Sequence, residues 1–313
     1  MIFSRCQRFS AFALSVTLSA LAPAAHADEP LFGFIYTTDL LPAGKFEVEQ
    51  WGTWRHQKAH GSYNLFEGKN EFSYGVTDDF QLSAYITYDK TSAYHNGTDY
   101  TTQPPEQFSA NFSDPNSRFN GSKFIGVSLE AFYRILSPYT DPVGLAVYFE
   151  PTIGNDFREY EARAILQKNF LDDRLVLAFN ATWAPEIRYL PPDPYADPGS
   201  VAASQNTNVE TDINFGLGAS YRFAPNWSAG WELQNEREVN GWAAFARSQW
   251  MGNGYFTGPT LHYGGDHFFA TLTAWEQMPW GNNYMDSSVI AGGRDYDVDY
   301  EKYRLRLKVG YYF

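Results

Sequence analysis

The last eleven residues, 303–313, constrain the fold of this chain more than any other segment. Every odd position from Tyr303 to Phe313 is aliphatic or aromatic, whereas the even positions from 302 to 310 carry Lys, Arg or Gly. Successive side chains of a β-strand point to opposite faces, so one face of this segment is apolar and the other is cationic. The alternation predicts an amphipathic strand at the end of the chain.

The same alternation recurs upstream and predicts a series of antiparallel hairpins. Apolar residues alternate with polar ones on both sides of short polar turns, and longer connections separate the hairpins. With a first strand from Lys45 to near Arg55, the pattern predicts about twelve strands, and an even number with short turns on one side is typical of membrane barrels. The short connections are predicted at 77–79, 137–142, 169–173, 223–226 and 264–266. The longer ones, which alternate with them, are predicted at 57–63, 90–121, 184–207, 237–250 and 278–298, with one short exception at 153–157.

A sheet in hydrocarbon must be closed, because each unpaired backbone amide there costs several kcal/mol. Aromatic residues make up 18% of the chain, and many tryptophans fall near predicted strand ends, where they favour interfacial girdles. We therefore predict an all-β, transmembrane, antiparallel up-and-down β-barrel; the alternative is a secreted all-β sandwich or barrel that is soluble. The expected girdle residues are Trp54, Trp183, Trp227, Trp231, Trp250, Trp275, Trp280 and Tyr311.

The amino terminus has the pattern of a cleaved secretory signal. Arg5 and Arg8 precede an apolar stretch, 11–22, and Ala25-His26-Ala27 fits the cleavage pattern. This stretch of twelve residues is short of the ~20 that span a bilayer as a helix. The only cysteine, Cys6, lies in this segment, so we expect neither disulfides nor a cysteine-based site in the mature chain.

Three parts follow from these patterns: a signal peptide at 1–27, an N-terminal segment at 28–44 and a transmembrane barrel at 45–313. The segment 28–44 contains Leu31, Phe32, Phe34, Ile35 and Tyr36. Because it is apolar yet precedes the first strand, we expect it either on the periplasmic side, at the rim or as a short additional strand, or inserted into the barrel lumen.

The charge and the histidines exclude several function classes. The formal charge is −13, or −15 without Arg5 and Arg8, which argues against a nucleic-acid partner. No G-x-S-x-G or H-E-x-x-H motif occurs, so an enzyme is not expected. A lipid-modifying enzyme remains the least favoured alternative, with His60 or His95 as the base for a loop serine, Ser62 or Ser92.

Charged and aromatic side chains on the inward face are the candidate pore lining. Because the last strand of a closed barrel pairs with the first, we expect Arg304 and Arg306 to lie beside Glu47 and Glu49. Such a row would impose a transverse field on solutes; alternatively, the charges pair with one another and fill a narrow lumen. The predicted lining residues are Glu47, Glu49, Trp51, Tyr85, Glu130, Arg134, Tyr148, Arg163, Arg222, Arg304 and Arg306, with Phe124, Phe132, Phe256, Phe269 and Trp275 as further inward aromatic residues.

Acidic residues alternate at Asp295, Asp297, Asp299 and Glu301, just before the last strand. Several oxygen ligands suit Ca²⁺, but such a row is more often a solvated strand end, and no EF-hand spacing is present. We predict neither a metal site nor a cofactor.

The segment from Thr37 to Trp51, together with the C-terminal strand, resembles a group of uncharacterised Gram-negative outer-membrane barrels that are similar to porin-like proteins and small-solute transporters. The resemblance implies a channel in the bacterial outer membrane for passive uptake of a small polar or aromatic solute. It also implies contact with outer-membrane lipids and lipopolysaccharide, and recognition of Phe313 by the barrel-assembly machinery. The alternative is a FadL-like importer of hydrophobic compounds, with a lateral opening where Gly258-Pro259 would kink a strand.

Overall fold

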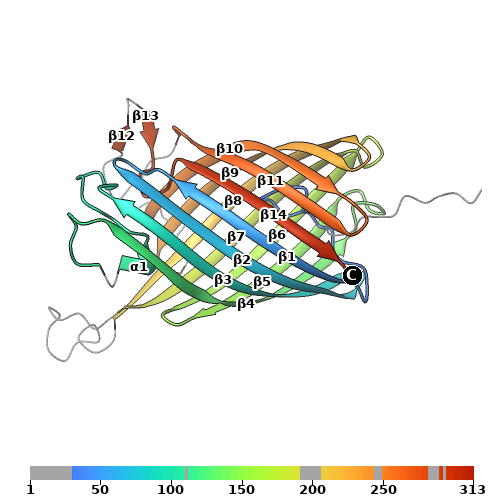
Figure 1. Ribbon diagram of the computed structural model, residues 1–313. Helices are drawn as coiled ribbons and strands as arrows, with labels where there is room; N and C mark the ends of the chain where they lie inside the picture. Colours follow the sequence, from blue (N-terminus) through green and yellow to red (C-terminus); the bar gives the residue numbers. More distant parts are fainter. Residues whose placement is uncertain (1–29, 110–111, 191–205, 243–248, 281–288, 292–293) are drawn as a thin grey trace, which may run out of the picture.

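The computed structural model describes residues 30–313 except 110–111, 191–205, 243–248, 281–288 and 292–293. The predicted signal peptide, 1–27, lies outside the described residues. Twelve antiparallel strands form a closed barrel, which confirms the predicted fold and the predicted turns (Figure 1). The strands are β1 (Phe46–His56), β2 (Ser62–Thr77), β3 (Phe80–Tyr94), β4 (Phe119–Leu136), β5 (Gly144–Gly154), β6 (Phe157–Phe170), β7 (Leu175–Leu190), β8 (Asn206–Ala224), β9 (Trp227–Asn240), β10 (Trp250–Gly264), β11 (Phe268–Met278) and β14 (Tyr303–Tyr312).

The barrel closes where β14 pairs with both β1 and β11. Most short turns and the C-terminus lie at one end of the barrel, here called the turn end. The longer connections, together with the short turn between β5 and β6, lie at the opposite loop end (Figure 1). The loop end carries a short helix, α1 (Glu106–Ser109), and a two-stranded sheet of β12 (Val289–Ala291) and β13 (Arg294–Tyr296). No helix among the described residues is long and apolar enough to cross a membrane.

The two faces of the wall differ as the alternation predicts. On β14, Leu305 and Leu307 are exposed on the outer face, whereas Arg304 and Lys308 are buried inside. Trp54, Trp183, Trp227, Trp231 and Trp280 are exposed on the outside. Trp275 is the exception, because only 2% of its surface is exposed and it points into the lumen. The prediction that it belongs to an outer girdle was wrong, and its prediction as an inward aromatic residue was right.

A β-bulge overturns the prediction for Phe124, which is 45% exposed on the outside of the barrel. The register between β3 and β4 shifts between Thr87 and Tyr88, which pair with Gly126 and Phe124. The extra residue, Ile125, reverses the inside–outside order for the rest of the strand, since a one-residue slip moves every side chain to the other face. Ile125 accordingly lines the lumen.

The segment Gly258-Pro259 interrupts the pairing of β10 with β11, as a proline predicts. Thr257 pairs with Glu276 and Thr260 with Thr273, and the two residues between them have no partner on β11. The strands stay in contact there, because a Cβ on Gly258 would lie 1.8 Å from the carbonyl oxygen of Ala274.

Candidate functional site

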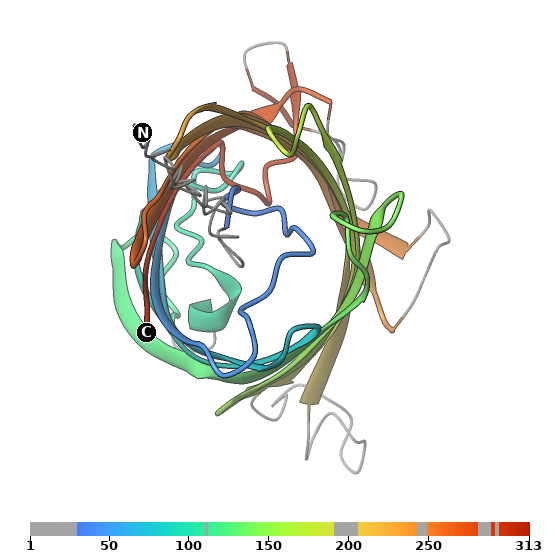
Figure 2. The same ribbon diagram turned by 90° about the vertical axis from the view of Figure 1, so that its right-hand side faces the viewer.

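Residues 30–44, here called the strap, cross the barrel lumen near the turn end (Figure 2). Of the two positions predicted for this segment, the structure therefore has the lumen-inserted one. Glu232 of β9 holds the strap through its main chain: its carboxylate accepts hydrogen bonds from the amides of Gly33 (2.9 Å), Phe34 (2.9 Å) and Ile35 (3.3 Å). It also accepts one from the hydroxyl of Thr273 at 2.9 Å. The strap thus has no sheet of its own, and a buried acid takes the place of strand pairing.

Three amide side chains of the wall continue this arrangement. Asn180 accepts from the amide of Tyr36 at 2.7 Å and donates to its carbonyl at 2.8 Å. Gln167 accepts from the amide of Thr38 at 2.7 Å, and Gln81 accepts from that of Leu41 at 2.9 Å. These contacts come from β7, β6 and β3, so the strap is fixed across the barrel.

Aromatic and cationic side chains pack on the strap. Phe34 stacks on Trp275 with ring centroids 3.8 Å apart. The guanidinium of Arg306 also contacts the Phe34 ring and lies 3.8 Å from its centroid. Tyr36 lies under the guanidinium of Arg163 at 4.2 Å and edge-on to Tyr148 at 5.5 Å. The apolar residues of the strap therefore face lumen aromatics, as folding into the lumen requires.

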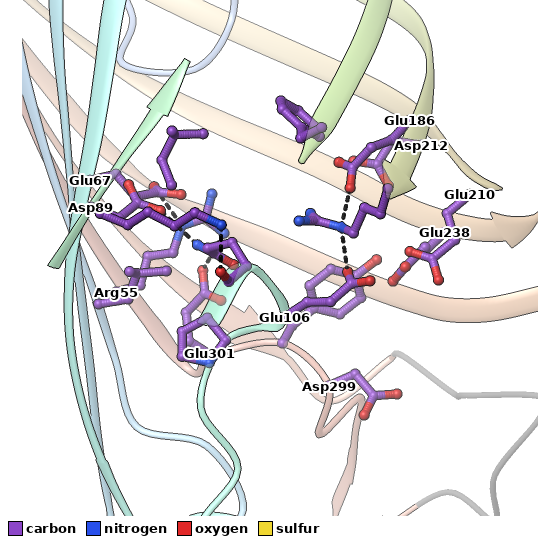
Figure 3. A pocket seen from close by; sticks show the side chains of 18 of the residues that line it. Arg55, Glu67, Asp89, Glu106, Glu186, Glu210, Asp212, Glu238, Asp299 and Glu301 are labelled. Atoms are coloured by element: carbon purple, nitrogen blue, oxygen red, sulfur yellow. Dashed lines mark hydrogen bonds and ion pairs between the residues drawn. The ribbon is translucent and has the colours of Figure 1, made fainter. Parts of the chain in front are cut away.

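Toward the loop end the lumen opens into an outer cavity of about 690 Å³. Its walls carry two charged groups that face each other (Figure 3). One group centres on Arg55, which pairs with Glu67 (2.7 Å) and Glu301 (3.1 Å). The other centres on Arg188 of β7, which pairs with Glu186 and, at 3.0 Å, with Glu106 of α1. Figure 2 shows α1 inside the outline of the barrel, and Glu106 and Gln107 of this helix line the outer cavity, so α1 narrows it.

Two loop carboxylates of this cavity have shifted pKa values. Burial raises the pKa of Glu106, although the charge of Arg188 opposes the shift. Burial also acts to raise the pKa of Glu301, but Arg304 and Arg55 outweigh it and lower that pKa to about 2. Glu301 is therefore a permanent anion, whereas Glu106 takes up a proton more readily than a free glutamate.

A middle cavity of about 210 Å³ lies between the outer cavity and the strap. Arg55 lines both cavities, so they adjoin. Arg304 is bound to Glu236 on β9 through both terminal nitrogens and also contacts Glu301. Lys69 lies 3.4 Å from Glu150.

An inner pocket of about 40 Å³ lies beside the strap on the side of β1 to β4 and shares Tyr36 and Trp51 with the middle cavity. Lys308 lines it, with its ammonium group 3.6 Å from the Trp51 ring. Glu49 and Glu71 each have one buried carboxylate oxygen without a hydrogen-bond partner among the described residues. The narrowest part of the lumen is therefore polar, although aromatic rings border it.

The structure brings most of the predicted lining residues together. Trp51, Tyr148, Arg163, Arg304 and Arg306 line the middle cavity, and Glu49 and Glu130 line the inner pocket, which Trp51 shares. Tyr85 is buried and donates to Glu71 and Glu130, and Glu47 is buried near the turn end. Arg134 and Arg222 lie outside these cavities: Arg134 pairs with Asp79 at the turn end, and Arg222 precedes the turn between β8 and β9.

The expected pairing of the cationic row with Glu47 and Glu49 is wrong, although β14 does pair with β1. Arg306 lies opposite Thr53 and Arg304 opposite Arg55, whereas Glu49 lies opposite Gly310. The antiparallel register places the end of β14 beside the start of β1, so the arginines lie nearer the loop end than the two glutamates.

Sequence reasoning missed the role of the strap anchors and of α1. The alternation along β9 places Glu232 on the inward face, but its partners are 197–199 residues away, and no local pattern indicates such contacts. The connection at 90–121 is long enough to fold over or into the mouth of the barrel, but nothing in its sequence indicates that Glu106 pairs with Arg188.

A cluster of carboxylates lies at the loop end of the lumen: oxygens of Glu106, Glu210 and Glu238 lie within 4.8 Å of one another. Such oxygens suit a hard cation. The alternating acidic row near β14 is different, because its members have separate partners. Asp297 accepts from the amide of Asn253 at 2.7 Å, and Glu301 pairs with arginines.

The two histidines considered as bases stack on tyrosines. The ring of His60 lies 4.1 Å from that of Tyr100, and the ring of His95 lies 4.0 Å from that of Tyr94. Neither imidazole has a hydrogen bond to a serine hydroxyl among the described residues.

Comparison with solved structures identifies outer-membrane barrels as similar folds. The COG4313 outer membrane channel from Pseudomonas putida F1 is 12% identical, with a TM-score of 0.56 over 88% of this chain and 98% of that chain. The translocator domain of the autotransporter NalP from Neisseria meningitidis is 11% identical, with a TM-score of 0.51 over 88% of this chain and 91% of that one. At these identities the likeness establishes the fold.

A comparison with curated proteins gave no match. A family model, described as a family of unknown function (DUF6662), matches residues 24–313, which is nearly the whole chain. The chain therefore belongs to the DUF6662 family.

Proposed function

We propose that the protein is a channel of the bacterial outer membrane through which a small polar solute diffuses down its gradient. The observation that carries the proposal is the series of polar cavities inside a closed barrel: outer and middle cavities share Arg55, and middle cavity and inner pocket share Tyr36 and Trp51. Polar groups and charges along a lumen favour the passage of hydrated or charged solutes over apolar ones. The similar fold of an outer membrane channel agrees with this proposal.

The strap makes this a restricted channel. It crosses the lumen, and the inner pocket that remains beside it, between its Tyr36 and Trp51 of β1, is about 40 Å³. A pocket of that size holds water molecules but few solutes. Uptake of anything larger therefore requires the strap to shift, and the strap acts as the gate.

Planar-bilayer recording tests the proposal with two proteins: the mature chain, and a variant that lacks residues 28–44. We expect small or rare current steps from the mature chain and larger, stable steps from the variant, which should also swell liposomes in sugar solutions. If the variant, refolded and inserted, passes neither ions nor sugars, the channel proposal is wrong.

The lateral route proposed for FadL-like importers makes a different prediction. It needs a wall opening for an apolar solute, and Gly258-Pro259 is where the pairing of β10 with β11 is interrupted. The close contact of Gly258 with Ala274 favours the aqueous route over this one. A detergent or lipid molecule bound through the wall at this point in a crystal structure would favour the lateral route instead.

A further inference from the structure

The charge of the lumen changes sign along its axis. The outer cavity is lined by ten carboxylates and four cationic side chains, so it is strongly acidic. The middle cavity has five cationic side chains and three carboxylates, so it is basic. Because the two cavities adjoin at Arg55, a solute that lies across the boundary meets a negative field at one end and a positive field at the other.

The acidic side is concentrated on β8 and β9. Arg188 is the cation nearest to this wall, and it is already bound to Glu186 and Glu106. Glu210, Asp212 and Glu238 have no cationic partner among the described residues. Figure 3 shows these three carboxylates on one side of the cavity. Glu210 accepts a hydrogen bond from Asn208 and shares one with Glu238, so an ammonium group at this wall would bind Asp212 and the remaining carboxylate oxygens of the other two.

The basic side has one cation without a carboxylate partner. Four of the cationic groups of the middle cavity are paired with acids: Arg55, Lys69, Arg163 and Arg304. The guanidinium of Arg306 instead donates to the hydroxyl of Thr53 (2.8 Å) and the carbonyl of Gly33 (3.1 Å), and it has no carboxylate partner in the described chain. A guanidinium bound only to neutral acceptors is the natural site for a carboxylate of the solute.

The distance between the acidic and the basic lining at the cavity boundary sets the size of the ligand. Asp212 lines the outer cavity and Asn214, two residues along β8, lines the middle one; Glu238 and Glu236 have the same relation on β9. Two residues of a strand span about 7 Å. The two fields are thus separated by the length of a short aliphatic chain.

We propose that the lumen binds small amphoteric solutes, which carry an amine and a carboxylate on a chain of a few carbons. The ammonium group lies at Asp212 and Glu238, and the carboxylate lies toward Arg306. This inference rests on the proposed channel function and names its solute class. A solute with both groups satisfies both fields, whereas a simple amine or a simple acid has a charged group for only one of them.

Isothermal titration of the mature protein in detergent tests the inference with three ligands of the same chain length: γ-aminobutyrate, butylamine and butyrate. We expect γ-aminobutyrate to bind about tenfold more tightly than either of the others, since each loses one charge-assisted contact. If butylamine or butyrate binds as tightly as γ-aminobutyrate, the inference is wrong. Absence of binding by all three also overturns it, but leaves the channel proposal to the current recordings, which do not depend on these ligands.

Two variants assign the ends of the ligand. Arg306→Gln should lower the affinity for γ-aminobutyrate to that for butylamine without lowering the affinity for butylamine. Arg306→Lys should restore much of the difference in affinity between the two ligands. Asp212→Asn combined with Glu238→Gln should weaken both amines but not butyrate. The matched controls are Arg118→Gln and Asp99→Asn, which change exposed loop residues outside the cavities and should alter nothing. An equal loss for all three ligands in Arg306→Gln and Arg306→Lys would indicate a structural role and overturn the assignment.

Discussion

Substitution of Glu232 by alanine should release the strap, because this single carboxylate binds three consecutive main-chain amides. A hydrogen bond to a charged group contributes about 1.5–3 kcal/mol, and part of this is recovered when lumen water hydrates the freed amides. We therefore expect the free energy that holds the strap in the lumen to fall by about 3 kcal/mol, which shifts the equilibrium between docked and released strap by about 100-fold. Glu232→Gln keeps an acceptor oxygen and should have an intermediate effect.

The assay combines planar-bilayer current with chymotrypsin cleavage of the refolded protein. In the unchanged protein Phe34 is buried in the lumen and should resist cleavage. In Glu232→Ala we expect longer and larger openings together with faster cleavage at Phe34. The matched control is Glu276→Gln, which alters an exposed acid near the loop end of β11. If Glu232→Ala inserts normally but matches the control in both current and cleavage, the strap is not held by this carboxylate and the gating argument fails.

Three further changes test the packing and electrostatics of the barrel. Arg304→Gln leaves Glu236 without its buried partner and should lower the free energy of unfolding by about 3–5 kcal/mol, measured as the urea midpoint of the barrel in vesicles. Gly258→Ala drives a Cβ against the carbonyl oxygen of Ala274 and should cost about 1–3 kcal/mol in the same assay. Burial raises the pKa of Asp297 to about 6, above its value in an unfolded chain. The folded loop therefore binds the extra proton, so its stability should be greatest near pH 4 and fall as the pH rises to about 6, which hydrogen exchange of residues 294–302, corrected for intrinsic rates, can measure.

Each of these predictions has a contrasting outcome. Arg118→Gln is the control for Arg304→Gln, and equal urea midpoints for the two would show that the buried pair contributes no stability. A Gly258→Ala midpoint equal to that of the unchanged protein would mean that the two strands separate easily at this point. For the pH effect, Asp297→Asn should abolish the difference between low and neutral pH; a difference that survives in this variant must come from another group.

Much of the fold could be predicted from the sequence, because period-two alternation is local and repeats in every strand. The twelve strands and the turns follow from it, and so does the inward position of Trp51, Arg163 and Arg304. The alternation fails where the backbone inserts a residue: at Ile125 the bulge sends Phe124 outward, and nothing in the neighbouring sequence indicates the slip.

The site could be predicted only in part, since its essential contacts join distant segments. The alternation of side chains along β9 gives the inward position of Glu232. Its attachment to the strap depends on how residues 30–44 cross the lumen, which exists only after the barrel has closed. The alternation likewise could not predict the register of β14 on β1, because it assigns a residue to one face of the sheet but not to a height along the barrel.

The way the wall holds the strap has an evolutionary consequence. The wall holds the strap mainly through main-chain amides, which every amino acid except proline has, and the holding side chains are Glu232, Asn180, Gln167 and Gln81. Gln167 also bonds the side chains of Thr38 and Asp39. Related proteins can therefore vary most strap residues without loosening it, provided that proline does not replace any of the residues whose amides are donors, which are Gly33, Phe34, Ile35, Tyr36, Thr38 and Leu41. Comparison of homologues should accordingly find these four wall residues more conserved than the residues of the strap.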